Sequence, residues 1–100
     1  MADIIVRSAA SADIADIYAF SAEQFGLETA DAYHDALQSA IARLADLPET
    51  GAVYPGLRPA IRFLTYRRHH IMYDYDGETV WIVRIIHQAR DVRQFMWGAG

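Results

Sequence analysis

The chain has 100 residues, of which 53% are hydrophobic. It contains nine basic residues, all arginine, and 13 Asp and Glu residues, which gives a net charge of −4. This length and composition predict one globular domain spanning residues 1–100 rather than a disordered chain. The chain has no cysteine, which excludes disulfides and thiolate chemistry. No signal-peptide pattern and no apolar run of the ~20 residues that cross a membrane is visible, so we expect a cytoplasmic protein without a membrane partner.

The charge is divided unevenly along the chain. Residues 1–50 hold two arginines and nine acidic residues, whereas residues 51–100 hold seven arginines and four acidic residues. A basic C-terminal half favours an anionic partner. The alternative is that the two halves neutralise each other within the fold, and both interpretations stay open at this point.

A short strand is predicted at Asp3–Arg7, followed by a helix within residues 8–25. Ser11 is the expected N-cap of this helix, and Asp13 would then lie in its first turn, where a carboxylate opposes the helix dipole. Apolar residues at helical spacing, Ile14, Ile17, Tyr18 and Phe25, are expected to face the core. Gly26 is the expected stop.

A second helix is predicted over residues 28–47, because its apolar residues form one stripe and Pro48 disfavours helical geometry before it. The stripe consists of Tyr33, Ala36, Leu37, Ala40, Ile41 and Leu44. The short connection "GLE" implies an antiparallel pair of helices. The acidic residues Asp13, Asp16, Glu23, Glu28, Asp31 and Asp35 are expected to form a solvated surface.

Three strands are predicted after a loop at residues 48–60, namely residues 61–66, 69–75 and 79–87. Arg67-Arg68 forms the first tight turn, and Asp76-Gly77 indicates a type I′ hairpin. The last strand is apolar on both faces and is therefore expected in the centre of the sheet. We expect Trp81, Val83 and Ile85 on one face, and Val80, Ile82 and Ile86 on the other. Residues 89–97 predict a short final helix.

This order of elements predicts an α+β fold. It consists of an N-terminal strand, an antiparallel helical hairpin packed on a small, mainly antiparallel sheet, and a short C-terminal helix.

The segment "YRRHHIMYDYDGETVWIVRIIHQARD", together with the helical pair before it, resembles the toxins of RelE/ParE type II toxin–antitoxin systems. The resemblance covers nearly the whole chain. It implies the RelE/ParE-like fold, a cognate ParD-like antitoxin and a hetero-oligomer with that antitoxin. The ending "RIIHQARDV" is similar to the ParE branch, whose members inhibit DNA gyrase by protein–protein binding. The RelE branch, ribosome-dependent mRNA endoribonucleases, and a non-toxic homologue that only binds its antitoxin are the alternatives.

A ribonuclease would use His87 as acid or base, with Arg67 and Arg84 stabilising the phosphate transition state. Residues three apart in a strand face opposite ways, so Arg84 and His87 would meet only at a bulge or a strand end. The sequence also has no lysine. We therefore predict no catalytic residues and no enzyme activity, with the nuclease as the alternative.

A docking surface agrees better with the arginine and aromatic content of the C-terminal half, because these residues dominate binding hot spots. The candidates for antitoxin or target binding are Arg58, Arg62, Tyr66, Arg67, Arg90, Arg93, Phe95 and Trp97. Neighbours His69 and His70 point to opposite faces, so no metal site is predicted. No cofactor and no direct sequence-specific nucleic-acid binding is expected.

Overall fold

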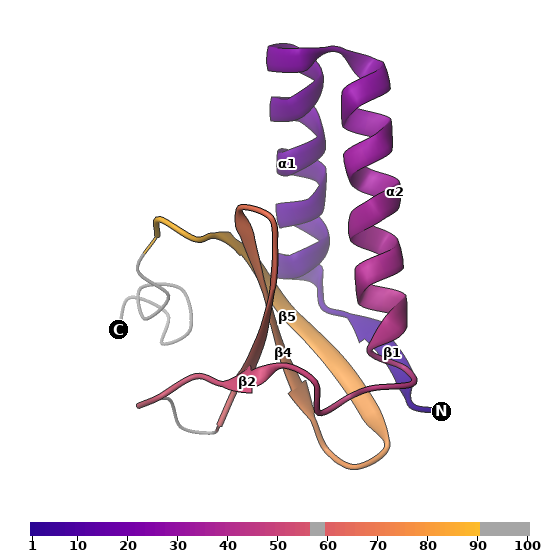
Figure 1. Cartoon of the computed structure of the whole chain (residues 1–100), viewed down its shortest axis with the longest axis vertical. Helices are drawn as coiled ribbons and strands as arrows, with labels where there is room; N and C mark the ends of the chain where they lie inside the picture. Colours follow the sequence, from indigo (N-terminus) through magenta and orange to yellow (C-terminus); the bar gives the residue numbers. More distant parts are fainter. Residues whose placement is uncertain (57–59, 91–100) are drawn as a thin grey trace.

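The computed structural model describes residues 1–56 and 60–90, and it confirms the α+β architecture (Figure 1). Two helices pack on one face of a five-stranded sheet with the strand order β1-β5-β4-β3-β2. β1 pairs with β5 in parallel, and the other neighbours are antiparallel. The elements are β1 (Asp3–Val6), α1 (Ser8–Phe25), α2 (Leu27–Arg43), β2 (Ala52–Val53), β3 (Arg62–Tyr66), β4 (His69–Tyr75) and β5 (Thr79–His87).

The helical hairpin is tighter than predicted. Gly26 alone connects α1 to α2, and its φ of 94° lies in the region that glycine adopts without a steric penalty. α1 begins at Ser8 after the N-cap residue Arg7, with no side-chain cap. The prediction that Ser11 caps the helix is therefore wrong, and Asp13 lies beyond the first turn.

α2 also ends earlier than predicted. It stops at Arg43 rather than just before Pro48. The N–H groups of Leu44 and Ala45 bond the carbonyls of Ile41 and Ala42, so the chain tightens into i→i−3 turns before the proline is reached.

The main core lies between the helices and the sheet, as the apolar stripe of α2 predicted. Its buried members are Ala10, Ile14, Leu37, Ala40, Ile41, Leu44, Ile71, Tyr73, Val80, Ile82 and Ile85. A smaller cluster of Ile61, Met72 and Ile86 lies on the opposite face of the sheet. The prediction for Phe25 is wrong, since this residue is exposed near the tip of the hairpin.

β5 lies between β1 and β4, which confirms the prediction of a central strand. Its register with β4 shifts between Met72 and Tyr73, and Val83 is the extra residue on β5. Such a bulge reverses the alternation of side chains beyond it. Ile85 therefore joins the helix-facing core and Ile86 the opposite cluster, the reverse of the predicted faces.

The two turns of the sheet are where the sequence placed them. Arg67 adopts a positive φ of 54° in the β3–β4 turn. The β4–β5 connection is a three-residue loop rather than a type I′ turn, because Asp76 does not share the positive φ of Gly77. The Asp76 carboxylate accepts the N–H groups of Glu78 and Thr79, which fixes the loop.

Two further predictions concern the ends of the sheet. The loop at residues 48–60 contains the short strand β2, which was not predicted. Most of the predicted final helix, residues 91–97, lies outside the described residues, and Gln88–Arg90 form a turn. Among the described helices, none is long and apolar enough to span a bilayer.

Candidate functional site

A groove of about 560 Å³ lies between the helical hairpin and the end of the sheet that carries the β3–β4 turn. The helices contribute Asp16, Ile17, Phe20, Ser21, Phe25, Thr29 and Tyr33, and the sheet contributes Arg67, Arg68, His69 and His87. The groove therefore has an apolar and aromatic wall opposite a cationic rim, and it joins segments that are far apart in the sequence.

The apolar wall exists because the hairpin extends beyond the sheet (Figure 1). The side chains near its tip have no strand beneath them, so Phe20 and Phe25 are 61% and 66% exposed. Leu27, the first residue of α2, is also exposed. Contiguous apolar surface of this kind marks interaction sites in folded proteins.

Tyr33 and His69 join the two layers at the base of the groove. The Tyr33 hydroxyl lies 2.6 Å from Nδ1 of His69. Burial lowers the pKa of His69, and the neighbouring His87 and His70 lower it further. A neutral imidazole can accept the phenolic proton at Nδ1, so this bond connects α2 to β4 without placing a charge in the interior.

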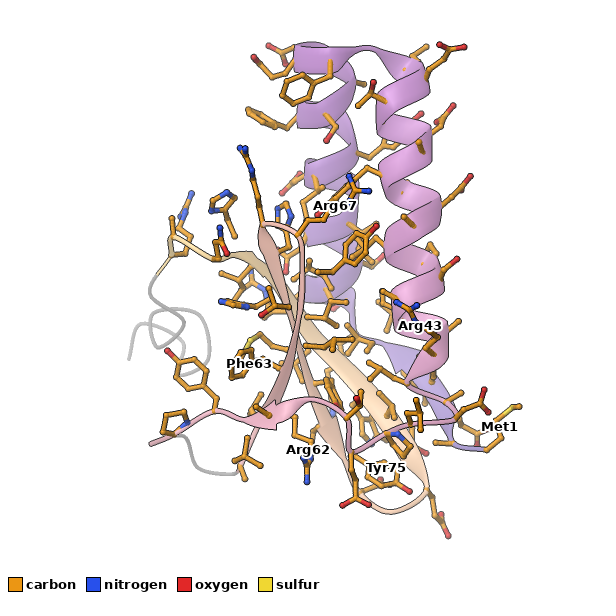
Figure 2. The ribbon with its side chains drawn as sticks, viewed as in Figure 1. Met1, Arg43, Arg62, Phe63, Arg67 and Tyr75 are labelled. Atoms are coloured by element: carbon orange, nitrogen blue, oxygen red, sulfur yellow. The ribbon has the colours of Figure 1, made fainter. Side chains whose placement is uncertain are left out.

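The cationic rim is formed by the β3–β4 turn. The Arg67 guanidinium carbon lies 6.0 Å from the centre of the Tyr33 ring and 5.5 Å from that of Tyr66. Figure 2 shows Arg67 at the end of the turn, beside the hairpin. Stacking on two rings restricts the side chain, and the contact with Tyr33 places it against α2.

His87 lies where the groove meets a second hollow of about 260 Å³, which Arg90 also lines. Its Nδ1 accepts the N–H of Ala89 at 3.1 Å, and its ring contacts that of His69 at 5.4 Å. His87 is thus a hydrogen-bonding residue at the end of β5, as the docking interpretation predicted.

The three residues of the nuclease alternative do not form one site. The Arg84 guanidinium donates two hydrogen bonds of 2.8 Å to Asp13, and this pairing raises the pKa of Arg84. Arg67 stacks on tyrosines at the β3–β4 turn. Of these three residues, His87 alone lines both the groove and the hollow beside Arg84.

The predicted docking residues do not all lie on one surface of the described structure. Arg67 lines the groove with its guanidinium over the Tyr66 ring, and Arg90 lines the adjoining hollow. Arg62 lies at the far end of β3 (Figure 2), where its guanidinium binds the Glu49 and Gly51 carbonyls at 3.2 and 2.8 Å. Arg58, Arg93, Phe95 and Trp97 lie outside the described residues.

The helical half of the groove was not predicted from the sequence. Phe25 and Tyr33 belong to the predicted apolar stripes and Arg68 to the predicted turn, whereas Phe20 belongs to neither. Phe20 was the available signal, because it is a large aromatic residue outside the apolar stripe of its helix.

The predicted lack of a metal site rests on the two adjacent histidines. His69 bonds Tyr33 on the helix side, whereas His70 lies 2.9 Å from the Thr65 hydroxyl in the neighbouring strand. Within residues 1–56 and 60–90, no three His, Cys, Asp or Glu side chains converge on a common point.

The chain is similar to known proteins over most of its length. Residues 4–92 match the family model of the ParE toxin of the type II toxin–antitoxin system parDE. Toxin ParE1 of Mycobacterium tuberculosis is 34% identical over 89 residues, which cover 88% of this chain and 91% of the relative. Toxin ParE1 of Caulobacter vibrioides is 33% identical over 84 residues, with coverages of 84% and 86%.

A solved structure shares the fold. It is described as the chromosomal ParDE system from P. aeruginosa, and it superposes with a TM-score of 0.76 at 24% identity. The match covers 87% of this chain and 96% of that chain.

Proposed function

Because this chain belongs to the ParE toxin family of type II parDE toxin–antitoxin systems, we propose that a cognate ParD-like antitoxin neutralises it and that, when free, it inhibits DNA gyrase by protein–protein binding. The protein acts in the cytoplasm, where both partners are found. The antitoxin and the toxin form a hetero-oligomer.

The groove between the hairpin and the β3–β4 turn carries the docking part of this proposal. An amphipathic helical segment presents apolar side chains at i, i+3 or i+4, and i+7 along one stripe. Such a stripe matches the wall that contains Phe20 and Phe25. Carboxylates beside the stripe would pair with Arg67 and Arg68, because guanidinium groups bind carboxylates with two parallel hydrogen bonds.

Gyrase as the target rests on membership of the family. The arrangement of the basic residues supports binding rather than RNA cleavage, because Arg84 is held by Asp13 and does not share a site with Arg67. A surface that acts by binding needs anchors and charge complementarity, and it needs no residue that transfers a proton.

The docking step can be tested with Phe25→Asp in the groove and Leu47→Asp as a matched control, since Leu47 is an equally exposed apolar residue away from the groove. We expect Phe25→Asp to weaken the binding of the co-expressed antitoxin at least ten-fold in calorimetry, with the control unchanged. Equal affinity of both variants would contradict docking in the groove.

The target can be tested with the purified toxin in a gyrase supercoiling assay. We expect loss of supercoiling, and restoration when the antitoxin is added. The alternative function predicts cleavage of mRNA at the ribosome, abolished by His87→Ala. That result, with gyrase unaffected, would replace the proposed target by the ribosome.

A further inference from the structure

β1 forms one edge of the sheet. It pairs with β5 on one side, and no strand within residues 1–56 and 60–90 pairs with its other side. The N–H groups of Asp3 and Arg7 bond the carbonyls of Glu78 and Ile82. Backbone groups alternate in direction along a strand, so the N–H and C=O groups of Ile4 and Val6 point away from β5. Such an unpaired edge is a template for a further strand.

The free edge has a defined length. Before β1, the N–H of Ala2 is already bonded by the Ala45 carbonyl at 2.7 Å. After Arg7, the chain turns into α1 at Ser8. The unpaired stretch is therefore the five residues "DIIVR", Asp3 to Arg7.

We propose that this edge pairs antiparallel with the same edge of a second copy of the chain, around a two-fold axis at Ile5. In that register Asp3 lies opposite Arg7 of the other copy, and Ile4 lies opposite Val6. The sequence is thus complementary to itself, with unlike charges at both ends and apolar residues between them.

The directions of the backbone N–H and C=O groups in β1 are compatible with this register. Ile4 and Val6 have outward-pointing groups, so each Ile4–Val6 couple is a hydrogen-bonded pair of the new ladder. The two Ile5 residues form the non-hydrogen-bonded pair on the axis, where antiparallel Cα atoms approach to about 4.5 Å. The two five-stranded sheets become one continuous sheet.

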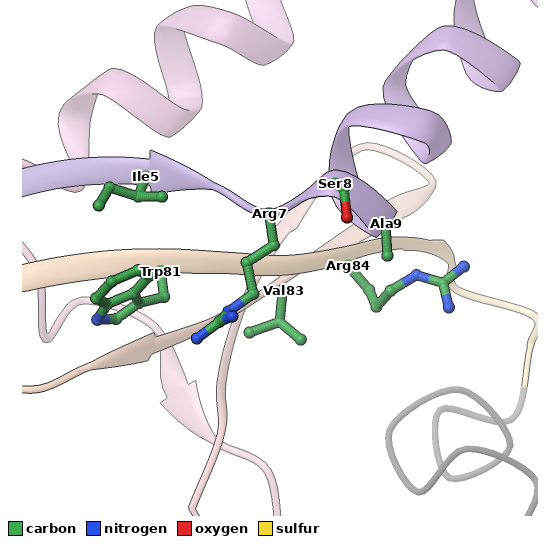
Figure 3. Close-up of a pocket in the computed structure, with 7 residues that line it drawn as sticks. All are labelled: Ile5, Arg7, Ser8, Ala9, Trp81, Val83 and Arg84. Carbon is green, nitrogen blue, oxygen red and sulfur yellow. The ribbon is translucent and has the colours of Figure 1, made fainter.

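The side chains of β1 are also compatible with the antiparallel register. Ile5 lies beside Trp81 in the sheet register, and Figure 3 shows Ile5, Arg7 and Trp81 along one face, where they line a hollow of about 500 Å³. The Arg7 guanidinium lies 4.9 Å from the centre of the Trp81 ring. Asp3 shares this face with Ile5 and Arg7, because strand residues alternate.

The second copy also accounts for exposed apolar surface on an edge strand. Ile5 and Val6 are 43% and 37% exposed, and pairing covers both. One strand pair is a small interface, well below the ~1,200 Å² of stable complexes. Association is therefore weak and rises with concentration, and it leaves the groove at the hairpin accessible.

A cysteine cross-link tests the register directly, since the chain has no cysteine of its own. Ile5→Cys places two thiols across the axis at a Cα separation within the ~4.4–6.8 Å range of disulfides. Val53→Cys is the matched control, because Val53 is 50% exposed on β2 at the other edge of the sheet. We expect at least ten-fold faster dimer formation by Ile5→Cys under mild oxidation. Equal rates for both variants would overturn the proposal.

A charge exchange tests the pairing of Asp3 with Arg7. Asp3→Arg or Arg7→Asp alone places like charges opposite each other, and we expect each to weaken self-association at least ten-fold in sedimentation velocity. The double exchange Asp3→Arg with Arg7→Asp restores unlike charges and should recover the association of the parent chain. The register would be contradicted if the single variants associated as tightly as the parent chain. It would also be contradicted if the double variant associated no more tightly than the single variants.

Discussion

Arg84 in β5 donates two hydrogen bonds of 2.8 Å to the carboxylate of Asp13 in α1. The same carboxylate accepts the N–H of Ile85 at 2.9 Å. β1 ends at Val6, so in the described part of the chain no strand lies beside β5 at this level on that side. The Asp13 side chain takes the place of that strand and fixes the start of α1 to the end of the sheet that bears the groove.

We predict that Asp13→Ala lowers the free energy of unfolding by about 3 kcal/mol, because it removes two hydrogen bonds from the partly buried Arg84 guanidinium and the acceptor of the Ile85 N–H. Urea titration measures this change. Asp35→Ala is the control, since Asp35 is solvent-exposed on α2, and it should change the stability by less than about 0.5 kcal/mol. Similar values for both variants would show that the ion pair is not structural.

Leu37 tests the main core. Its side chain is buried between the helices and the sheet, so Leu37→Ala opens a cavity there and should cost about 2–5 kcal/mol. Leu47→Ala removes the same atoms from an exposed position. We expect little change for this control in the same denaturant titration, and a neutral Leu37→Ala would contradict the packing of α2.

The fold was predictable where periodicity determines it. The stripe through Leu37 and Ile41, the apolar β5 and the turn at Gly77 each follow from local rules of spacing and backbone conformation. The bulge at Val83 was not predictable, because an extra residue in one strand leaves no mark in an apolar run. The sequence therefore predicted the wrong face of the sheet for both Ile85 and Ile86.

The groove was only partly predictable for a different reason. Arg67 was found because basic and aromatic residues adjoin a turn. Phe20 and Phe25 belong to it because the hairpin is longer than the sheet it covers, and that is a property of the tertiary structure. Asp13 was likewise assigned to a solvated surface, since its partner Arg84 is 71 residues away.

Tyr73 anchors the loop after α2. Its buried hydroxyl accepts the N–H of Gly51 and donates to the Pro48 carbonyl, both at 2.8 Å. Tyr73→Phe should cost about 1–3 kcal/mol, because a buried N–H loses its acceptor. Tyr75→Phe removes only an exposed hydrogen bond to the Gly77 carbonyl and is the control in thermal unfolding. Equal costs would contradict the anchoring role.

The same contact explains why a glycine is needed in this loop. A Cβ atom on Gly51 would lie 2.6 Å from the Tyr73 hydroxyl and 2.7 Å from the Phe63 carbonyl oxygen. We predict that Gly51→Ala destabilises the protein by about 1–3 kcal/mol, as overpacking does. Thermal unfolding of the double variant Gly51→Ala, Tyr73→Phe checks the coupling. The double variant should lose less stability than the sum of the losses in the two single variants.

His69 should make the stability depend on pH. Its pKa in the folded protein lies below the ordinary 6.5 because of burial, so the unfolded chain binds more protons below that pH. Its contribution is complete above about pH 6.5 and is lost as the pH falls toward the folded pKa. His70, whose pKa is also lowered by burial, acts in the same direction.

We therefore expect the free energy of unfolding to fall between about pH 7 and pH 5, and His69→Phe to reduce that slope. Denaturant titrations at several pH values measure it. His70→Phe should reduce the slope as well, because burial also lowers the pKa of His70. An unchanged slope in His69→Phe would contradict the assignment.

Arg67 and Arg62 should separate binding from stability, because they occupy opposite ends of β3 (Figure 2). Arg67→Gly relieves a positive φ that costs a non-glycine residue about 1 kcal/mol, so stability should be kept or slightly raised. Antitoxin affinity should fall at least ten-fold in calorimetry, since the rim of the groove loses its stacked guanidinium. Arg62→Ala should show the reverse pattern, because Arg62 binds the loop carbonyls of Glu49 and Gly51. If Arg62→Ala weakened binding and Arg67→Gly did not, the docking surface would lie at the far end of the sheet.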